Sequence, residues 1–191
     1  MENIAGLVLA AGSGSRLGEP KAQVFYRDER LVDRAVRLLR DAGCSQIFVV
    51  LGAWVGEVSG ATVIVNPEWQ KGLSTSFSSG LRALEKFNLA EQSQNQIDSV
   101  LLTLVDLPGM TSEAFKAVAE TAGEIVVAQY DGQRSHPMKF HRDHWAALIK
   151  SSHGDHGARD FLYQRSDIAM VPIDAIADGR DLDFPEDFAH F

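Results

Sequence analysis

The chain has 191 residues, of which 45% are hydrophobic and 23% are charged. This length and composition predict one globular domain over residues 1–191, and the formal charge of −8 argues against a general binder of nucleic acid or of anionic membranes. There is no apolar run of about 18 residues that would predict a transmembrane helix. A secretory signal has positive charge before its apolar segment, whereas no positive charge precedes the apolar segment 4–11. A single cysteine, Cys44, excludes an internal disulfide, and we expect a cytoplasmic protein.

The predicted elements, taken in chain order, alternate between strands and helices. Residues 4–9 form a continuous apolar run, which is typical of a buried parallel strand. Asp131 and Gly132 form a hairpin signal, so the strand after them is expected to return antiparallel. The other predicted strands are 47–51, 61–65, 100–105, 125–130, 133–140 and 169–173, and the predicted helices are 31–42, 74–87, a helix capped by Thr111, 142–150 and 157–163, with a surface loop at 91–96. We therefore predict an α/β fold with a mostly parallel, mixed central sheet.

A glycine-rich segment from Leu9 to Lys21 directly follows the first predicted strand. Open α/β sheets bind ligands beyond the carboxyl ends of their strands, and successive backbone N–H groups of small residues form a nest for anionic oxygens. Arg16 and Lys21 add positive charge in the same segment. The pattern predicts a site for a polyphosphate, with a plain glycine and serine turn as the alternative.

Two better-known phosphate loops do not fit this segment. Gly12, Gly14 and Gly18 are spaced by two and four residues, whereas the dinucleotide fingerprint has spacings of two and three. The segment Pro20–Ala22 lacks the G-K-[ST] sequence that opens a helix in a P-loop.

Asp106 ends the most apolar predicted strand, and Pro108 stops that strand. A carboxylate in this setting is costly unless it is hydrogen-bonded, ion-paired or bound to a metal. Asp106 is expected at the same sheet edge as the glycine-rich segment, where a hard cation such as Mg²⁺ would suit it. An aspartate that only forms a tight turn is the alternative.

The acidic C-terminal part of the chain has two interpretations. Residues 174–191 contain six acidic residues and one arginine. A solvated acidic terminus is the simpler interpretation, while clustered carboxylates also suit a divalent cation.

Five blocks of the sequence contain small, polar or charged residues at set spacings. They are Ala10-Ala11-Gly12-x-Gly14-x-Arg16-x-Gly18-x-x-Lys21, Asn66-Pro67-x-Trp69-x-x-Gly72-Leu73-Ser74-x-Ser76, Thr103–Pro108, Gly154-Asp155-x-Gly157-Ala158-Arg159 and Asp181–Asp187. Together they resemble the molybdenum-cofactor nucleotidyltransferases, and in particular their cytidylyltransferase-like branch. They occur in the family order over nearly the whole chain. The resemblance implies a three-layer, Rossmann-like nucleotidyltransferase fold.

The resemblance also implies roles for individual residues. Catalytic roles fall to Arg16, Lys21 and Asp106, and Mg²⁺ is expected on Asp106 and Asp183. Phe184 stands where the family usually has threonine, so Asp181 is the alternative second ligand. The implied acceptor-binding residues are Ser76, Asp155 and Arg159. The implied nucleotide-binding residues are Leu9, Ala10, Ala11, Gly12, Ser13, Gly14, Ser15, Arg16, Lys21, Asn66, Gly72 and Ser74.

The implied reaction transfers a nucleotidyl group to a phosphorylated acceptor and releases pyrophosphate. Ala11 stands where the guanylyl branch has glycine, which implies CTP as donor, with the phosphate of molybdopterin as acceptor. A molybdenum enzyme is then a potential partner. Two alternatives stay open: a nucleotidyltransferase for GTP or for a sugar or polyol phosphate, and a non-catalytic protein that delivers the molybdenum cofactor. For Ser74, Trp69 and Arg159, a helix cap, a core residue and a surface residue are the respective structural alternatives.

Overall fold

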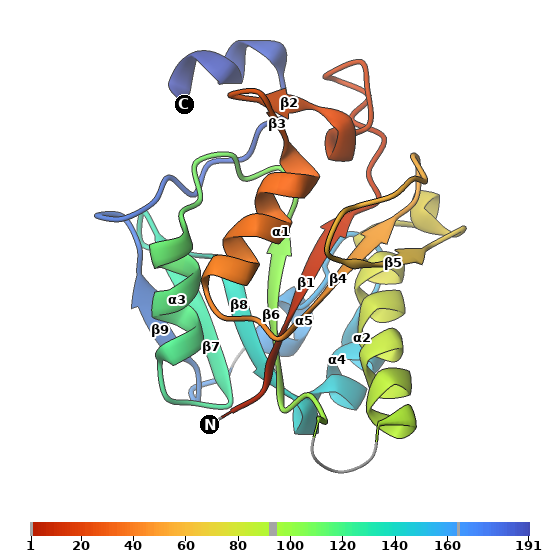
Figure 1. The fold of residues 1–191 in the computed structure, drawn as a ribbon. Helices are drawn as coiled ribbons and strands as arrows, with labels where there is room; N and C mark the ends of the chain where they lie inside the picture. The colour runs from red at the N-terminus through yellow and green to blue at the C-terminus, as the bar shows by residue number, and fades with distance from the viewer. Residues whose placement is uncertain (1, 92–94, 164) are drawn as a thin grey trace.

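A computed structural model describes residues 2–91, 95–163 and 165–191 of the protein. A seven-stranded sheet lies at its centre, in the strand order β5-β4-β1-β6-β8-β7-β9 (Figure 1). The strands are β1 (Ile4–Ala10), β4 (Gln46–Leu51), β5 (Thr62–Val65), β6 (Ser99–Leu104), β7 (Ile125–Tyr130), β8 (Gln133–His141) and β9 (Ala169–Pro172). The pairs β1·β4, β1·β6, β4·β5 and β7·β9 are parallel, while β8 runs antiparallel to both β6 and β7. The prediction of a mostly parallel, mixed sheet with a late hairpin is confirmed.

Helices cover both faces of the sheet, which produces three layers (Figure 1). One face carries α1 (Leu31–Asp41) and α3 (Ser112–Glu120), and the other carries α2 (Leu73–Ala90), α4 (Trp145–Ser151) and α5 (Arg159–Leu162). Side chains of a strand alternate between its faces, so β1 contributes Val8 to one buried apolar cluster and Leu7 to the other. A sheet buried on both faces explains why its strands read as continuous apolar runs.

Some predicted boundaries are wrong. The residues predicted as one helix at 142–150 form a 3-10 turn, Arg142–His144, followed by α4, and the helix predicted at 157–163 is the short α5. Gly157 has a positive φ of 51°, which a right-handed helix does not allow, so α5 begins only at Arg159. The predicted loop at 91–96 includes residues 92–94, which lie outside the described part of the chain.

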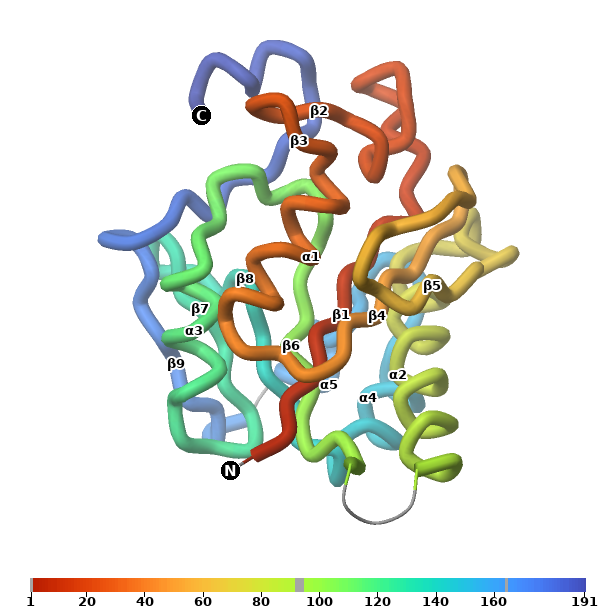
Figure 2. The backbone as a smooth tube through the Cα atoms, in the orientation of Figure 1, coloured from red at the N-terminus to blue at the C-terminus, as the bar shows by residue number. Residues whose placement is uncertain are grey.

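The acidic C-terminal segment is packed against the body of the protein, although Asp174, Asp181 and Glu186 are exposed to solvent as one of its two interpretations predicts. Leu182 is fully buried, and its N–H donates to the carbonyl oxygen of Asp106 at 2.8 Å. The final 3-10 helix, Pro185–His190, lies beside the hairpin of β2 (Phe25–Tyr26) and β3 (Glu29–Arg30) (Figures 1 and 2). The Tyr26 hydroxyl donates to the carbonyl oxygen of Phe191 at 3.3 Å. Apolar residues interspersed among the acids therefore bind this segment to the body of the protein.

No helix in the described ranges combines the length and the apolar character that crossing a bilayer requires.

Candidate functional site

The glycine-rich segment and Asp106 meet at one edge of the sheet. The segment leaves the carboxyl end of β1, and Asp106 follows β6, the parallel neighbour of β1. The N–H of Val105 donates to the carbonyl oxygen of Leu9 at 3.1 Å, which extends this pairing beyond β6. Two features that are about 95 residues apart in sequence are therefore adjacent, because parallel strands end at the same edge.

A tight turn shapes the segment between Gly14 and Gly18. The carbonyl oxygen of Gly14 accepts from the N–H groups of Leu17 at 2.8 Å and Gly18 at 3.0 Å. Gly14 has φ of +58°, and a Cβ atom there would lie 2.0 Å from the carbonyl oxygen of Glu19. Only glycine fits this conformation and this close approach without strain. The turn carries Arg16 at its tip and leads to Lys21.

Lys21 lies between two carboxylates from distant parts of the chain. Its Nζ atom is 2.6 Å from Asp106 Oδ2 and 2.7 Å from Asp183 Oδ1. Burial alone would lower the pKa of Lys21, but the Asp106 and Asp183 carboxylates outweigh that effect and raise the pKa. The ammonium group is therefore charged at neutral pH, and it holds the C-terminal segment against the end of β6.

Arg16 reaches the same cluster from the other side. Its Nη1 atom is 3.5 Å from Asp183 Oδ2, and its side chain is 63% exposed. Arg16 and Lys21 are thus both paired with Asp183, and the positive charge expected for a polyphosphate is largely neutralised within the protein. A bound anion has to compete with Asp183, or a cation has to neutralise that carboxylate.

The carboxylates next to Lys21 fit a divalent cation whose remaining ligands come from substrate or water. Asp106 Oδ1 is buried and has no hydrogen-bond partner among the described residues, which leaves one hard oxygen donor available. Asp181 is exposed as a residue, yet desolvation of its carboxyl group and the nearby Asp106 charge raise its pKa to about 6. Within residues 2–91, 95–163 and 165–191, no group of three or more His, Cys, Asp or Glu side chains is arranged to hold a metal by itself.

Two small cavities border this cluster. A cavity of about 190 Å³ is lined by Gly14, Ser15, Arg16, Lys21 and Asp183. A second cavity of about 340 Å³ shares Lys21 with the first and extends along the glycine-rich segment. Nine of the residues that line this second cavity were predicted as site residues from the sequence, namely Leu9, Ala11, Gly12, Ser13, Lys21, Gly72, Ser76, Asp106 and Asp155. Most of the residues predicted for nucleotide and metal binding are therefore brought together, with Ser76 and Asp155 on this side of the site.

Asn66 and Ser74 line neither cavity. The Asn66 amide group donates to Thr75 Oγ1 at 2.9 Å and to Ser76 Oγ at 3.0 Å, so its buried side chain organises the start of α2. Ala10 is buried in the sheet and also lines neither cavity. These three residues lie behind the cavity surface, and their predicted contact with nucleotide stays a prediction.

The first two N–H groups of α2 are bonded within the protein. The N–H of Leu73 donates to Asp155 Oδ1 at 3.1 Å, and the N–H of Ser74 donates to the carbonyl oxygen of Gly154 at 2.9 Å. Gly72 has φ of +111°, and a Cβ atom there would lie 2.6 Å from the Gly154 oxygen. The 154–155 loop thus caps α2 through Asp155 Oδ1, while Asp155 also lines the 340 Å³ cavity, so its predicted contact with the acceptor stays a prediction.

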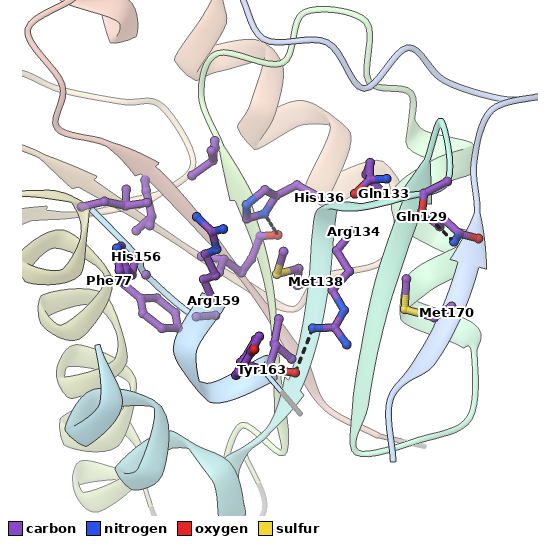
Figure 3. Close-up of a pocket in the computed structure, with 18 residues that line it drawn as sticks. Phe77, Gln129, Gln133, Arg134, His136, Met138, His156, Arg159, Tyr163 and Met170 are labelled. Carbon is purple, nitrogen blue, oxygen red and sulfur yellow. Dashed lines mark hydrogen bonds between the residues drawn. The ribbon is translucent and has the colours of Figure 1, made fainter. Parts of the chain in front are cut away.

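A larger cavity of about 710 Å³ adjoins the second one, with which it shares Leu9, Leu73 and Leu104 (Figure 3). Apolar side chains from the sheet and from α2 line much of it, including Phe77, Met138 and Met170. Polar groups also line it, namely Gln129, Gln133, Arg134, His136, His156, Arg159 and Tyr163. Arg134 is fixed because it donates to the carbonyl oxygen of Leu162 at 2.8 Å. Of the predicted acceptor-binding residues, Arg159 alone lines this cavity.

His136 enters the larger cavity at an irregularity in β8. Val127 pairs with Met138 while Ala128 pairs with Ser135, so β8 carries two extra residues at this point. The imidazole Nδ1–H donates to the carbonyl oxygen of Leu102 at 3.4 Å, as Figure 3 shows, which leaves Nε2 as an acceptor. Burial lowers the pKa of His136, against the smaller effects of the Leu102 carbonyl and Asp106. The imidazole is therefore neutral at pH 7.

Sequence reasoning missed most of the larger cavity. Gln129, Gln133, Arg134 and Tyr163 were not predicted as site residues, although Arg134 and His136 alternate on the predicted strand 133–140. Residues i and i+2 share a face of a strand, so this spacing could have indicated that Arg134 and His136 line the same side of the sheet. Trp69, for which a position in the core was the structural alternative, lines the 340 Å³ cavity.

The sequence of this chain is similar to that of a known protein family and of named relatives. A family model described as the MobA-like NTP transferase domain matches residues 6–168. Nicotine blue oxidoreductase of Paenarthrobacter nicotinovorans is 31% identical, over 96% of this chain and 93% of its own length. Molybdenum cofactor cytidylyltransferase of Escherichia coli (strain K12) is 24% identical, over 98% and 95% respectively.

A solved structure supports the same fold. The crystal structure of Rv0371c from Mycobacterium tuberculosis H37Rv has a TM-score of 0.78 and 25% identity, and the match covers 99% of this chain and 97% of that one. The same protein in complex with manganese has a TM-score of 0.76 and 23% identity, over 98% and 97%.

Proposed function

Because the chain belongs to the MobA-like NTP transferase domain family, we propose that it transfers CMP from CTP to the phosphate of molybdopterin and releases pyrophosphate. The sequence resemblance to this family is confirmed, and nucleotidyltransferase chemistry is supported by the family and by the cytidylyltransferase relative. The observation that carries the proposal is the Lys21 ammonium group between Asp106 and Asp183, at the end of the glycine-rich turn.

In the proposed reaction, an acceptor phosphate oxygen attacks the α-phosphorus of CTP. A bond forms between these atoms, the bond to the bridging oxygen breaks, and that oxygen leaves with pyrophosphate. The backbone from Gly12 to Gly14 binds phosphate oxygens, while Arg16 and Lys21 stabilise the charge that develops on the leaving group. No general base is needed, because the acceptor phosphate is already ionised at neutral pH.

Asp106 and Asp183 are the residues that would hold Mg²⁺, with Asp181 as an alternative. When bound, Mg²⁺ would supply charge neutralisation for phosphate oxygens. It would also neutralise the carboxylates that now hold Lys21, so that the ammonium group becomes available to phosphate. The unpartnered Oδ1 atom of Asp106 supports this assignment.

The 710 Å³ cavity is the proposed acceptor site. It adjoins the nucleotide cavity, and its apolar lining suits the body of a flat molecule. Arg159 and Arg134 offer positive charge for an acceptor phosphate in a chain of net charge −8. Within the described ranges, Arg159 makes no side-chain hydrogen bond to the protein, whereas Arg134 bonds to the Leu162 carbonyl.

The preference for CTP rests on Ala11. Its side chain lines the 340 Å³ cavity, where the guanylyl branch has glycine and therefore more space. The full-length relative named as a cytidylyltransferase supports the same assignment.

A thermal-shift series with CTP, GTP, ATP and UTP, each with Mg²⁺, tests the proposal. Ligand that binds the native state at about 100 times its Kd stabilises by ~2.7 kcal/mol, so the preferred nucleotide raises the Tm most. CTP should give the largest shift, and pyrophosphate release should then require molybdopterin. A larger shift with GTP would move the protein to the guanylyl branch, and release of pyrophosphate only with a sugar or polyol phosphate would change the acceptor.

A second candidate function is oxidation–reduction of nicotine blue, which the 31% identical relative favours. Side chains of this chain supply no electron carrier of their own, so this function requires a bound nicotinamide or flavin nucleotide. The same thermal-shift series with NADH, NADPH and FAD distinguishes the two functions. Consumption of NADPH that depends on nicotine blue, together with no pyrophosphate release from any nucleoside triphosphate, would replace the first proposal by the second.

A further inference from the structure

We infer that Phe184 is a positioning residue that orients Arg16 toward the phosphates of the bound nucleotide, an inference that rests on the proposed nucleotide site. The Phe184 ring is 43% exposed, and the Cζ atom of Arg16 lies 5.2 Å from its centroid. At this distance the guanidinium group lies within range of a cation–π interaction.

The backbone around Phe184 is held firmly. The N–H groups of Asp183 and Phe184 both donate to Asp187 Oδ2, at 2.9 Å and 2.8 Å. On the other side, Leu182 is fully buried and bonded to the Asp106 carbonyl. The ring therefore stands on a fixed backbone, next in sequence to Asp183, which lines the 190 Å³ cavity together with Arg16.

Arg16 has few other restraints. Its ion pair with Asp183 is long, at 3.5 Å, and its side chain is mostly exposed. A mobile arginine loses rotamer entropy when it binds phosphate, and this loss weakens nucleotide binding. Contact with the Phe184 ring restrains Arg16 before nucleotide binds, so less rotamer entropy is lost on binding.

An aromatic ring has one advantage over a polar residue at this position. It interacts with the face of the guanidinium group and leaves the N–H donors at its edge available for phosphate oxygens. A threonine or a carboxylate at residue 184 would instead hydrogen-bond to those donors or leave the arginine unrestrained. Phe184 thus holds Arg16 without using its donors.

The contact itself is tested by NMR of the arginine Nε–Hε groups, with the Arg16 signal assigned from an Arg16→Lys spectrum. Ring current from Phe184 should shift this signal upfield. The shift should disappear in Phe184→Leu and persist in Phe184→Tyr. An unshifted Arg16 signal in the unmodified protein would overturn the inference without any reference to nucleotide.

The consequence is tested by calorimetric titration with CTP and Mg²⁺. Phe184→Leu should weaken CTP binding about two- to fivefold, the range of an exposed cation–π contact, while Phe184→Tyr restores it. In an Arg16→Ala background the Phe184→Leu change should have no further effect. Phe25→Leu is the matched control, because Phe25 is 62% exposed and lines none of the three cavities, and it should leave binding unchanged.

The outcomes separate the two proposals. If CTP binds and Phe184→Leu weakens binding equally with and without Arg16, the ring acts independently of Arg16 and the inference is wrong. If the unmodified protein binds no nucleoside triphosphate while the Arg16 signal is shifted, the contact exists but the proposed function fails, and with it the role in nucleotide binding.

Discussion

The ammonium group of Lys21 lies 2.6 Å from Asp106 Oδ2, and so occupies one side of the carboxylate that is proposed to hold the metal. The same ammonium group also binds Asp183, the second proposed ligand. Both side chains of the Lys21–Asp106 pair are more than four-fifths buried. A metal bound at the proposed site would therefore compete with Lys21 for the same carboxylates until phosphate offers Lys21 another partner.

Replacing Lys21 by methionine should strengthen metal binding in the absence of nucleotide. A unit charge at ~4 Å is worth ~4 kcal/mol at an effective dielectric constant of 20, and solvent screening leaves part of this repulsion. We expect the Kd of free Mn²⁺, measured by the loss of its EPR signal, to fall by about tenfold or more. CTP binding should weaken in the same variant, because a phosphate partner is lost.

Lys21→Arg is the control for this experiment, since it keeps the charge, and Mn²⁺ should bind it as weakly as the unmodified protein. Steady-state kinetics complete the test: Lys21→Met should lower kcat by roughly 10²–10³, with partial recovery in Lys21→Arg. Unchanged Mn²⁺ affinity in Lys21→Met would show that Lys21 and the metal do not share these carboxylates.

Asp106→Asn should remove most turnover while the protein stays folded. Asparagine keeps the shape of the strand end but lacks the charge that binds Mg²⁺ and one of the two charges that hold Lys21. Activity at saturating CTP should fall by about 10²–10³, and Mg²⁺ titration should require much higher concentrations. Far-ultraviolet circular dichroism and Tm check the fold.

Asp183→Asn and Asp181→Asn belong in the same series, because they decide which residue is the second ligand. Asp183→Asn should shift the Mg²⁺ requirement, and Asp181→Asn should not. The reverse result would assign the metal to Asp181, and normal pyrophosphate release by Asp106→Asn would exclude the metal assignment.

Local sequence patterns predicted those parts of the site that depend only on residues close together in the chain. The glycine-rich segment, its position after a buried strand and the position of Asp106 could all be read from spacing, apolar runs and turn residues. The position of Asp106 at the same sheet edge as the glycine-rich segment then followed from the common direction of parallel strands, but the contact between Asp106 and Lys21 was not predicted.

Contacts between distant segments could not be read in this way. The cap of α2 by Asp155 depends on an approach of the 154–155 loop to Gly72, and nothing local to either segment encodes it. The docking of the C-terminal segment through Leu182 was hidden by the surrounding acids, because composition reports charge and not which single apolar side chain is buried.

Gly14→Ala and Gly12→Ala should separate the shape of the phosphate turn from the space for the ligand. Alanine at residue 14 has to adopt φ of +58° and places its Cβ atom 2.0 Å from the Glu19 oxygen, so we expect a loss of ~2–4 kcal/mol and a Tm lower by about 5–10 °C. A Cβ atom at residue 12 meets no atom within 4 Å, and this residue lines the 340 Å³ cavity that is proposed to bind the nucleotide. Gly12→Ala should leave the Tm unchanged and weaken CTP binding, and equal Tm values for the two variants would contradict this turn geometry.

Cys44 should make the protein less stable as pH rises above 9. The thiol is 8% exposed, and burial raises its pKa from 9.0 to about 12. Between these values the unfolded chain has lost the thiol proton while the folded chain keeps it. The unfolded state therefore binds fewer protons, and the free energy of unfolding falls with increasing pH.

The expected effect is large enough to measure by urea unfolding at pH 8 and pH 10. One pH unit above a pKa of 9.0, ionisation of the unfolded thiol lowers the free energy of unfolding by about 1.4 kcal/mol. Cys44→Ala lacks this group. Between pH 8 and pH 10, the free energy of unfolding of the unmodified protein should therefore fall by about 1.4 kcal/mol more than that of the variant. Native Cys44 should also react slowly with iodoacetamide at pH 8.5 and quickly in urea, because the thiolate is the nucleophile. Parallel pH profiles for the two proteins, or rapid alkylation of the native thiol, would show that Cys44 ionises in the folded state.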